Sequence, residues 1–167
     1  RLNSGVVRNC LIYNNSASVS GWPDSGGIYN PGGQVINCTI CNNWGEKYAG
    51  IHAESAVFNT VLWGNRGDEA FSDPANFIAE DSHSSHNYAD EGFDASSFQS
   101  LSLSSDNDAA TGPRFNLPTT FIGAPTSVGQ IAAMRAADFS LKSTSLLIDH
   151  GRSDVAPAAD ITGTLRP

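Results

Sequence analysis

Six residues carry the side chains that a sugar-binding surface needs. They are aromatic, acidic or imidazole side chains along one edge of successive sequence repeats: Trp22, Asp24, Trp44, Glu46, Tyr48 and His52. Flat aromatic rings suit the apolar faces of sugars, and the two acids and the histidine would lie beside them. The pattern therefore favours a glycan-binding strip. The alternative is that these rings only cover the ends of the hydrophobic core.

The same region also contains acidic residues that could take part in polysaccharide cleavage. Glycoside hydrolysis needs two carboxyl groups about 5 to 9.5 Å apart, and elimination in uronates needs a base such as Lys or Arg. Asp24, Glu46 and Glu54 fall near corresponding parts of adjacent repeats, but they include no Asp-Asp pair. The two lysines, Lys47 and Lys142, do not sit in a repeated column among carboxylates. The pattern favours a non-catalytic module; the alternative is the C-terminal part of a polysaccharide lyase or glycoside hydrolase.

Metal and thiol chemistry receive less support. His83 and His86, with Glu80, Asp81 and Asp90 nearby, could form a metal cluster, but a solvated acidic loop is the better explanation. We therefore expect no metal and no cofactor.

An odd number of cysteines leaves at least one thiol free. Cys10 and Cys38 hold the same place in the repeat, so we expect them to stack as small buried hydrophobes. A disulfide or a metal site is the weaker alternative. Cys38 and Cys41 would point to opposite faces of a strand.

The strands and corners that must position these residues come from a nine-residue sequence motif, the repeated line, that occurs three times. It reads VRNCLIYNN from Val7, VINCTICNN from Val35 and VFNTVLWGN from Val57, at spacings of 28 and 22 residues. A shorter echo relates Gly27–Asn30 to Gly50–Ala53. Repeats of this length with short strands and tight corners predict an all-β fold, a parallel β-helix with coils of about 22 residues.

Each column of the repeat has an expected physical role. Two aliphatic columns should face inward: Val7, Val35 and Val57, and Ile12, Ile40 and Leu62. A column of asparagines should form a structural corner ladder, because Asn tolerates the left-handed backbone of a sharp corner: Asn9, Asn37 and Asn59. A second corner column is expected at Asn15, Asn43 and Asn65. An aromatic and apolar column should face outward, either under a later segment or as a contact site: Tyr13, Cys41 and Trp63.

After residue 65 the regular repeat stops. Strands are expected at 76–79, 98–103, 113–118, 138–142 and 146–151. Ser127 and Gln130 form a capping-box pattern, which predicts a short helix near 127–137 that packs on the coils. The chain is thus expected to be one β-helix domain over 1–167, with regular coils over 1–65 and irregular coils and a terminal cap over 66–167.

The end of the chain resembles a recurring ending of bacterial surface proteins with right-handed parallel β-helix (pectin-lyase-like) repeats. The residues that carry the likeness are Asp138–Lys142, Ser145, Ile148–Gly151, Asp160–Gly163 and Arg166–Pro167. The coils at Gly26–Asn30 and Val35–Ile40 are similar to repeats of the same proteins and to polymorphic outer-membrane repeats. The resemblance implies a right-handed β-helix and a secreted or cell-surface bacterial setting. It implies no particular activity, and the stretch Glu80–Asp108 matches none of its motifs.

Composition limits the partners. The net charge of −8 and a pI near 4.7 repel phosphate backbones, so nucleic acid is not expected as a partner. No run of 18 or more apolar residues occurs, so membrane insertion is not expected. The start at Arg1, directly in strand-like sequence, favours the C-terminal fragment of a longer polypeptide. The expected partners are a polysaccharide or cell-surface glycan and upstream β-helix coils of the same polypeptide.

Overall fold

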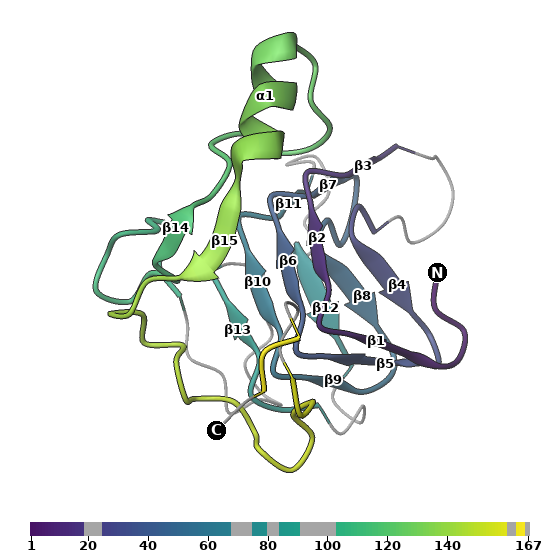
Figure 1. Ribbon diagram of the computed structural model, residues 1–167. Helices are drawn as coiled ribbons and strands as arrows, with labels where there is room; N and C mark the ends of the chain where they lie inside the picture. The colour runs from purple at the N-terminus through teal and green to yellow at the C-terminus, as the bar shows by residue number, and fades with distance from the viewer. Residues whose placement is uncertain (19–24, 68–74, 80–83, 91–102, 160–162, 166–167) are drawn as a thin grey trace.

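The computed structural model describes residues 1–18, 25–67, 75–79, 84–90, 103–159 and 163–165 (Figure 1). The described chain is all-β, with mostly parallel strands and one short helix. Sheet A contains β1 (Val6–Arg8), β5 (Gln34–Ile36) and β9 (Val57–Phe58). Sheet B contains β2 (Leu11–Tyr13), β6 (Thr39–Cys41), β10 (Val61–Trp63) and β13 (Tyr88–Ala89). Sheet C contains β3 (Ser16–Ala17), β7 (Trp44–Gly45) and β11 (Arg66–Gly67). Sheet D contains β4 (Ile28–Asn30), β8 (Ile51–Ala53) and β12 (Asn76–Ile78).

The repeated line sets the register of these sheets. Val35 pairs with both Val7 and Val57 in sheet A, and Ile40 pairs with Ile12 and Leu62 in sheet B. The aliphatic columns predicted from the repeat are therefore confirmed. Each of sheets A to D receives one strand from each successive segment of chain, so the arrangement is consistent with a parallel β-helix.

The corners between sheets A and B are formed by the predicted asparagines. Asn9, Asn37 and Asn59 have φ values of 53°, 54° and 53°, in the left-handed region that a sharp corner requires. Nδ2 of Asn37 donates a hydrogen bond to Oδ1 of Asn9, which links one corner to the next. The corner ladder predicted at these three residues is confirmed.

The second corner differs from the prediction by one residue. The left-handed residues are Asn14, Asn42 and Gly64, with φ values of 52°, 53° and 66°. The residues that follow them form an amide ladder instead: Asn15, Asn43 and Asn65. Asn43 and Asn65 are completely buried. A buried amide needs partners for its donors and its oxygen, and the ladder supplies them from coil to coil.

The main core lies between sheets A, B and D. Its completely buried members include Val35, Ile40, Ile51, Val57 and Leu62, and half-buried Val7, Cys10 and Ile12 pack against it. Cys38 belongs to this inner core, whereas Cys41 lies on the outer face of sheet B. All three cysteines are free thiols, and Cys10 and Cys38 follow equivalent corner asparagines, as expected.

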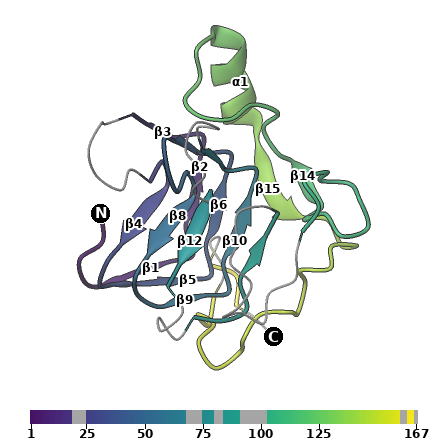
Figure 2. The same cartoon turned by 180° about the vertical axis from the view of Figure 1, so that it is seen from behind.

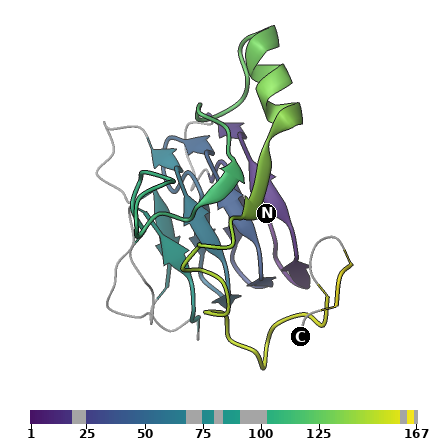
Figure 3. The ribbon, with the colours of Figure 1, turned by 60° about the vertical axis from the view of Figure 1, so that its left-hand side comes forward.

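The C-terminal half covers the outer face of sheet B. Strands β14 (Phe115–Leu117) and β15 (Asp138–Leu141) pair antiparallel with a bulge, and Figure 3 shows them lying across one side of the parallel sheets. A second core forms there, made of Cys41, Trp63, Tyr88, Leu103, Phe115, Phe139 and Leu147. Sheets B and D lie on opposite sides of the main core (Figures 1 and 2), so this cover does not reach sheet D.

Two expectations for this half were wrong. Helix α1 (Val128–Ala136) has Ser127 as its predicted N-cap, but none of its residues is buried, and it extends away from the sheets (Figure 1). Its apolar side chains do not gather on one face, so packing would have little surface to bury. The region 146–151 forms a turn rather than a strand, with Asp149 at a φ of 61°. Most of the strand predicted at 98–103 lies outside the described residues.

Candidate functional site

The outer face of sheet D carries a column of aromatic rings. Tyr29, His52 and Phe77 are the middle residues of β4, β8 and β12, and they pair in register, Tyr29 with His52 and His52 with Phe77. Alternation turns the flanking residues of each strand inward, so that Ile51 and Ile78, for example, belong to the main core. The three rings therefore lie on the outer side of the sheet, one from each of the neighbouring strands β4, β8 and β12 (Figure 2 shows the strands).

The rings touch one another and are joined by a fourth. The centroid of the His52 ring lies 4.9 Å from that of Tyr29, with the rings nearly parallel, and 5.3 Å from that of Phe77, edge to face. Tyr48 comes from the loop before β8, where its φ of 35° turns the chain, and its ring lies 4.4 Å from His52 and 5.5 Å from Phe77. We call these four residues the aromatic column.

The charges beside the aromatic column are sparse. Nε2 of His52 lies 3.6 Å from Oε1 of Glu54, whose side chain is half exposed. Burial lowers the pKa of His52, and the neighbouring Glu54 carboxylate opposes that shift only in part, so the imidazole is neutral at pH 7. Nδ1 of His52 is buried without a hydrogen-bond partner among the described residues. The guanidinium of Arg1 lies 5.2 Å from the centroid of the Tyr29 ring, in a cation–π contact.

The structure brings together part of the strip that the sequence suggested. Tyr48 and His52 are in ring contact, as described above. Trp44 lies in sheet C and is half-buried. It packs closely against Gly123, because a Cβ atom built on Gly123 would lie only 3.1 Å from the Cβ of Trp44. Glu46 is half-buried, and its Oε1 accepts a hydrogen bond of 3.5 Å from Oγ of Ser18. Trp22 and Asp24 lie outside the described residues.

Sequence reasoning missed two members of the aromatic column, Tyr29 and Phe77. The signal was present, because the echo of Gly27–Asn30 in Gly50–Ala53 aligns Tyr29 with His52. Applying strand alternation to that echo, and to the predicted strand at 76–79, would have placed all three rings on one outer column. The position of Trp44 just after a corner instead indicated Trp44, which lies in a different sheet.

The described charged groups do not assemble an open catalytic centre. Nη1 of Arg66 lies 3.6 Å from Oδ2 of Asp90, but the Asp90 side chain is completely buried, and Oδ2 also accepts the backbone N–H of Gly64 at 3.0 Å. Within the described ranges, no group of three or more His, Cys, Asp or Glu side chains could hold a metal ion. Of the five residues of the candidate metal cluster, only His86 and Asp90 are described. No helix in the described part of the chain is long and apolar enough to cross a membrane.

Comparisons with known proteins do not add to this geometry. The chain matches no protein-family model, no curated protein and no solved structure. The aromatic column therefore has to be interpreted from its own chemistry. Tyr29, Tyr48 and Phe77 are half-buried and His52 is only 8% exposed, so the half-buried rings offer stacking and apolar contact, with hydrogen-bonding groups at the margin.

Proposed function

We propose that the chain is part of a right-handed parallel β-helix of a secreted or cell-surface bacterial protein, and that it is a non-catalytic, adhesive module that binds glycan through the aromatic column. The observation that supports the proposal best is the in-register row of Tyr29, His52 and Phe77 on a face that no described segment of the C-terminal half covers. Fold alone does not fix this function, so the proposal is supported by the rings and not by the architecture.

The spacing of the rings suits a linear ligand. Neighbouring strands of a sheet lie about 4.8 Å apart, and the ring centroids follow at 4.9 Å and 5.3 Å. A sugar chain that runs across the strands would contact the half-buried rings of Tyr29 and Phe77 on either side of buried His52. Glu54 and the Tyr48 hydroxyl group can hydrogen-bond to hydroxyl groups at the margin.

The parallel β-helix part of the proposal rests on the stacking. Three successive segments contribute to sheets A to D in the same order, and all their pairings are parallel. Parallel neighbours need a crossover connection, and here the strands of the other sheets provide it. The secreted or cell-surface setting rests on the resemblance of the sequence ending and of the repeats.

A glycan array with immobilised neutral, amino and uronic polysaccharides tests the binding function. We expect the protein to bind at least one glycan, and the double variant Tyr29→Ala/Phe77→Ala to lose at least tenfold in affinity. Leu117→Ala is the matched control, because Leu117 is 56% exposed in β14, outside the aromatic column, and its removal should leave binding unchanged. Absence of binding to every glycan, or equal binding by the double variant, would contradict the proposal.

The same polysaccharides test the non-catalytic assignment. After incubation with the protein, their reducing ends and unsaturated products are measured. We expect no increase in either, because Asp90, the acidic partner of Arg66, is completely buried and not set in an open groove. Release of products would favour a polysaccharide lyase or glycoside hydrolase instead.

A further inference from the structure

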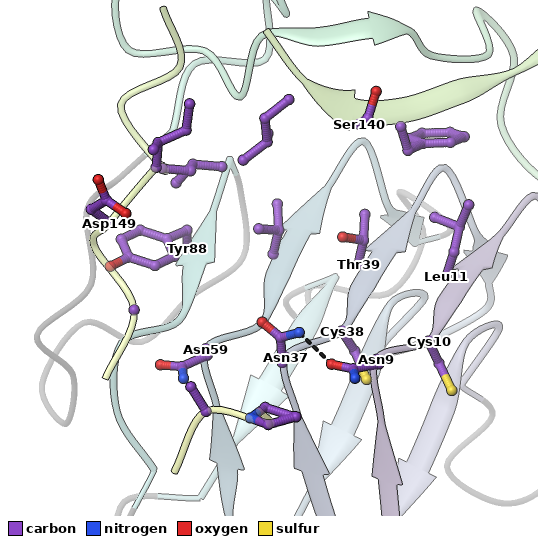
Figure 4. A pocket seen from close by; sticks show the side chains of 18 of the residues that line it. Asn9, Cys10, Leu11, Asn37, Cys38, Thr39, Asn59, Tyr88, Ser140 and Asp149 are labelled. Atoms are coloured by element: carbon purple, nitrogen blue, oxygen red, sulfur yellow. Dashed lines mark hydrogen bonds between the residues drawn. The ribbon is translucent and has the colours of Figure 1, made fainter. Parts of the chain in front are cut away.

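A cavity of about 1000 Å³ lies between the outer face of sheet B and the C-terminal segment (Figure 4). Each three-residue strand of sheet B has two outward positions, and the C-terminal half treats them differently. The last position is buried in two strands, with Cys41 completely buried and Trp63 only 8% exposed, and half-buried at Tyr13 of β2. The first position, occupied by Leu11, Thr39 and Val61 in neighbouring strands, is only half-buried and forms the floor of the cavity.

The lining of the cavity is more apolar than polar, and it mixes aliphatic and aromatic side chains with Asn, Asp, Ser and Thr. Phe139 and Leu141 of β15 line it from one side, and Leu147 and Ile148 line it from the turn that follows. In Figure 4 the side chains of Leu11 and Thr39 point from the sheet toward β15. The floor crosses adjacent strands, which are about 4.8 Å apart, so its three side chains follow one another along the stacking direction.

Hydrogen bonds to the corner ladder hold the C-terminal segment at the mouth of the cavity. The Asn59 side chain accepts from the backbone N–H of Arg152 at 2.7 Å and donates to its carbonyl at 2.9 Å. Nδ2 of Asn9 donates to the carbonyl of Ala159 at 2.8 Å. Because both ends of 152–159 are fastened to the ladder, the segment is positioned as a wall and does not rest on the aliphatic floor.

The charges around the cavity select the ligand. Its lining residues include the carboxylates Asp138 and Asp149, and no Lys, Arg or His is among the described residues that line it. Lys142 pairs with Asp108 and Arg152 pairs with Asp154; Arg135, three residues before Asp138, is not part of the lining. His150 follows Asp149 in the chain but is not part of the lining. The lining thus offers apolar contact and negative charge.

We propose that this cavity binds a single aliphatic chain that carries a cationic group. The chain lies along Leu11, Thr39 and Val61 beneath β15, and the cationic group meets the carboxylate of Asp138 or Asp149. This site is separate from the aromatic column, which lies on the opposite sheet, so the two proposals stand or fall independently.

Titration of the whole protein with decylammonium, decanol and decanoate, below their micelle concentrations, tests the proposal by heteronuclear NMR. We expect saturable one-site binding of decylammonium, at least tenfold tighter than that of decanoate, with decanol between them. Ligand-to-protein NOEs should connect the methylene protons with the methyl groups of Leu11, Val61 and Leu141. Absence of saturable binding, equal affinity for decanoate, or NOEs to other methyl groups would overturn the proposal.

Three variants locate the site. Thr39→Phe places a ring in the middle of the floor and should weaken decylammonium binding at least tenfold, whereas Tyr29→Ala on the opposite sheet should leave it unchanged. Asp138→Asn combined with Asp149→Asn should reduce the preference for decylammonium over decanol. Unchanged binding by folded Thr39→Phe would overturn the proposal; if that variant does not fold, the NOEs of the unaltered protein decide the question.

Discussion

The outer faces of sheets B and D follow the same strand alternation but lie in different environments. In sheet B and in sheet D, alternation sends apolar or aromatic residues outward, because the inward positions fill the main core. The outward residues of sheet B meet β14 and β15 and become a second core, with Phe115 only 1% exposed. Those of sheet D, on the opposite side (Figure 2 shows the sheet), form a row in which Tyr29 and Phe77 are half-buried and His52 is 8% exposed. A repeat pattern thus predicts which residues point outward, but later chain decides which of them stay at the surface.

The largest expected effect comes from deleting one ring on each face. Phe115 touches both Trp63, at 5.9 Å between centroids, and Phe139, at 5.3 Å. Phe115→Ala should lower the free energy of unfolding by about 3–5 kcal/mol, because it leaves a cavity in the second core. Phe77→Ala should cost about 0.5–1.5 kcal/mol, the range for lost contacts between rings. Urea unfolding measures both values, and equal losses would remove the distinction between the two faces.

The amide ladder inside the coils should give the next largest effect. The Asn43 side chain accepts from the backbone N–H of Asn15 at 3.0 Å and donates to the carbonyl of Ile12 at 3.1 Å and to Oδ1 of Asn65 at 3.0 Å. Each buried polar group that is left unpaired costs about 1–3 kcal/mol, so Asn43→Ala should destabilise the protein by at least that amount.

The matched control for the ladder is Asn116→Ala. Asn116 is exposed, and its side chain donates one surface hydrogen bond of 2.8 Å to Ser140. Its removal should change the free energy of unfolding only slightly. A loss in Asn43→Ala no larger than that in Asn116→Ala would show that the ladder does not stabilise the stacking.

Thiol labelling compares the accessibility of Cys41, beneath the C-terminal half, with that of half-buried Cys10 at the edge of the main core. Burial raises the pKa of the Cys38 thiol to about 11 and also raises the pKa of Cys41. Because the thiolate is the reactive form, an aromatic disulfide reagent should label half-buried Cys10 first in the native protein, and Cys41 only after unfolding. Peptide mass spectrometry locates the label. Phe139→Ala should increase the labelling rate of Cys41, and rapid labelling of Cys41 in the unaltered protein would contradict the cover.

The smallest expected effect is a pH dependence from the open face. The pKa of His52 is lowered by burial, so the unfolded chain binds the proton more readily than the folded protein. Stability should therefore fall as the pH drops below about 6.5, the ordinary pKa of histidine, and should be fully present above it. His52→Gln should flatten this dependence, whereas His150→Gln, at an exposed position, should not. Thermal unfolding from pH 7.5 to 5.5 measures the difference.

The sequence predicted the local rules of the fold. Three copies of one line placed Val7, Val35 and Val57 in register and Asn9, Asn37 and Asn59 at corners. At the second corner each of the first two lines has two adjacent asparagines, and both tolerate left-handed backbone. Gly64 in the third line marks the correct position, because it aligns with Asn14 and Asn42. The ladder of Asn15, Asn43 and Asn65 follows one residue later.

The parts that the sequence did not predict depend on contacts between distant residues. Phe139 reaches Tyr13 across 126 residues, with ring centroids 5.0 Å apart, and no local pattern specifies that meeting. Helix α1 has the predicted N-cap, Ser127, but no apolar face. The capping sequence therefore predicted where the helix begins, but not whether it packs on the sheets. The aromatic column was missed in part because its rings come from three separate coils. Only the register between the coils brings Tyr29, His52 and Phe77 together.

The C-terminal half covers the outer face of sheet B, and no described segment of it covers the aromatic column on sheet D. Hydroxyl-radical footprinting tests it with two residues of the same type, so that intrinsic reactivity cancels. Half-buried Phe77 on sheet D should be oxidised several times faster than Phe115, which is 1% exposed beneath the cover. Equal oxidation rates of Phe77 and Phe115 in the folded protein would contradict the account.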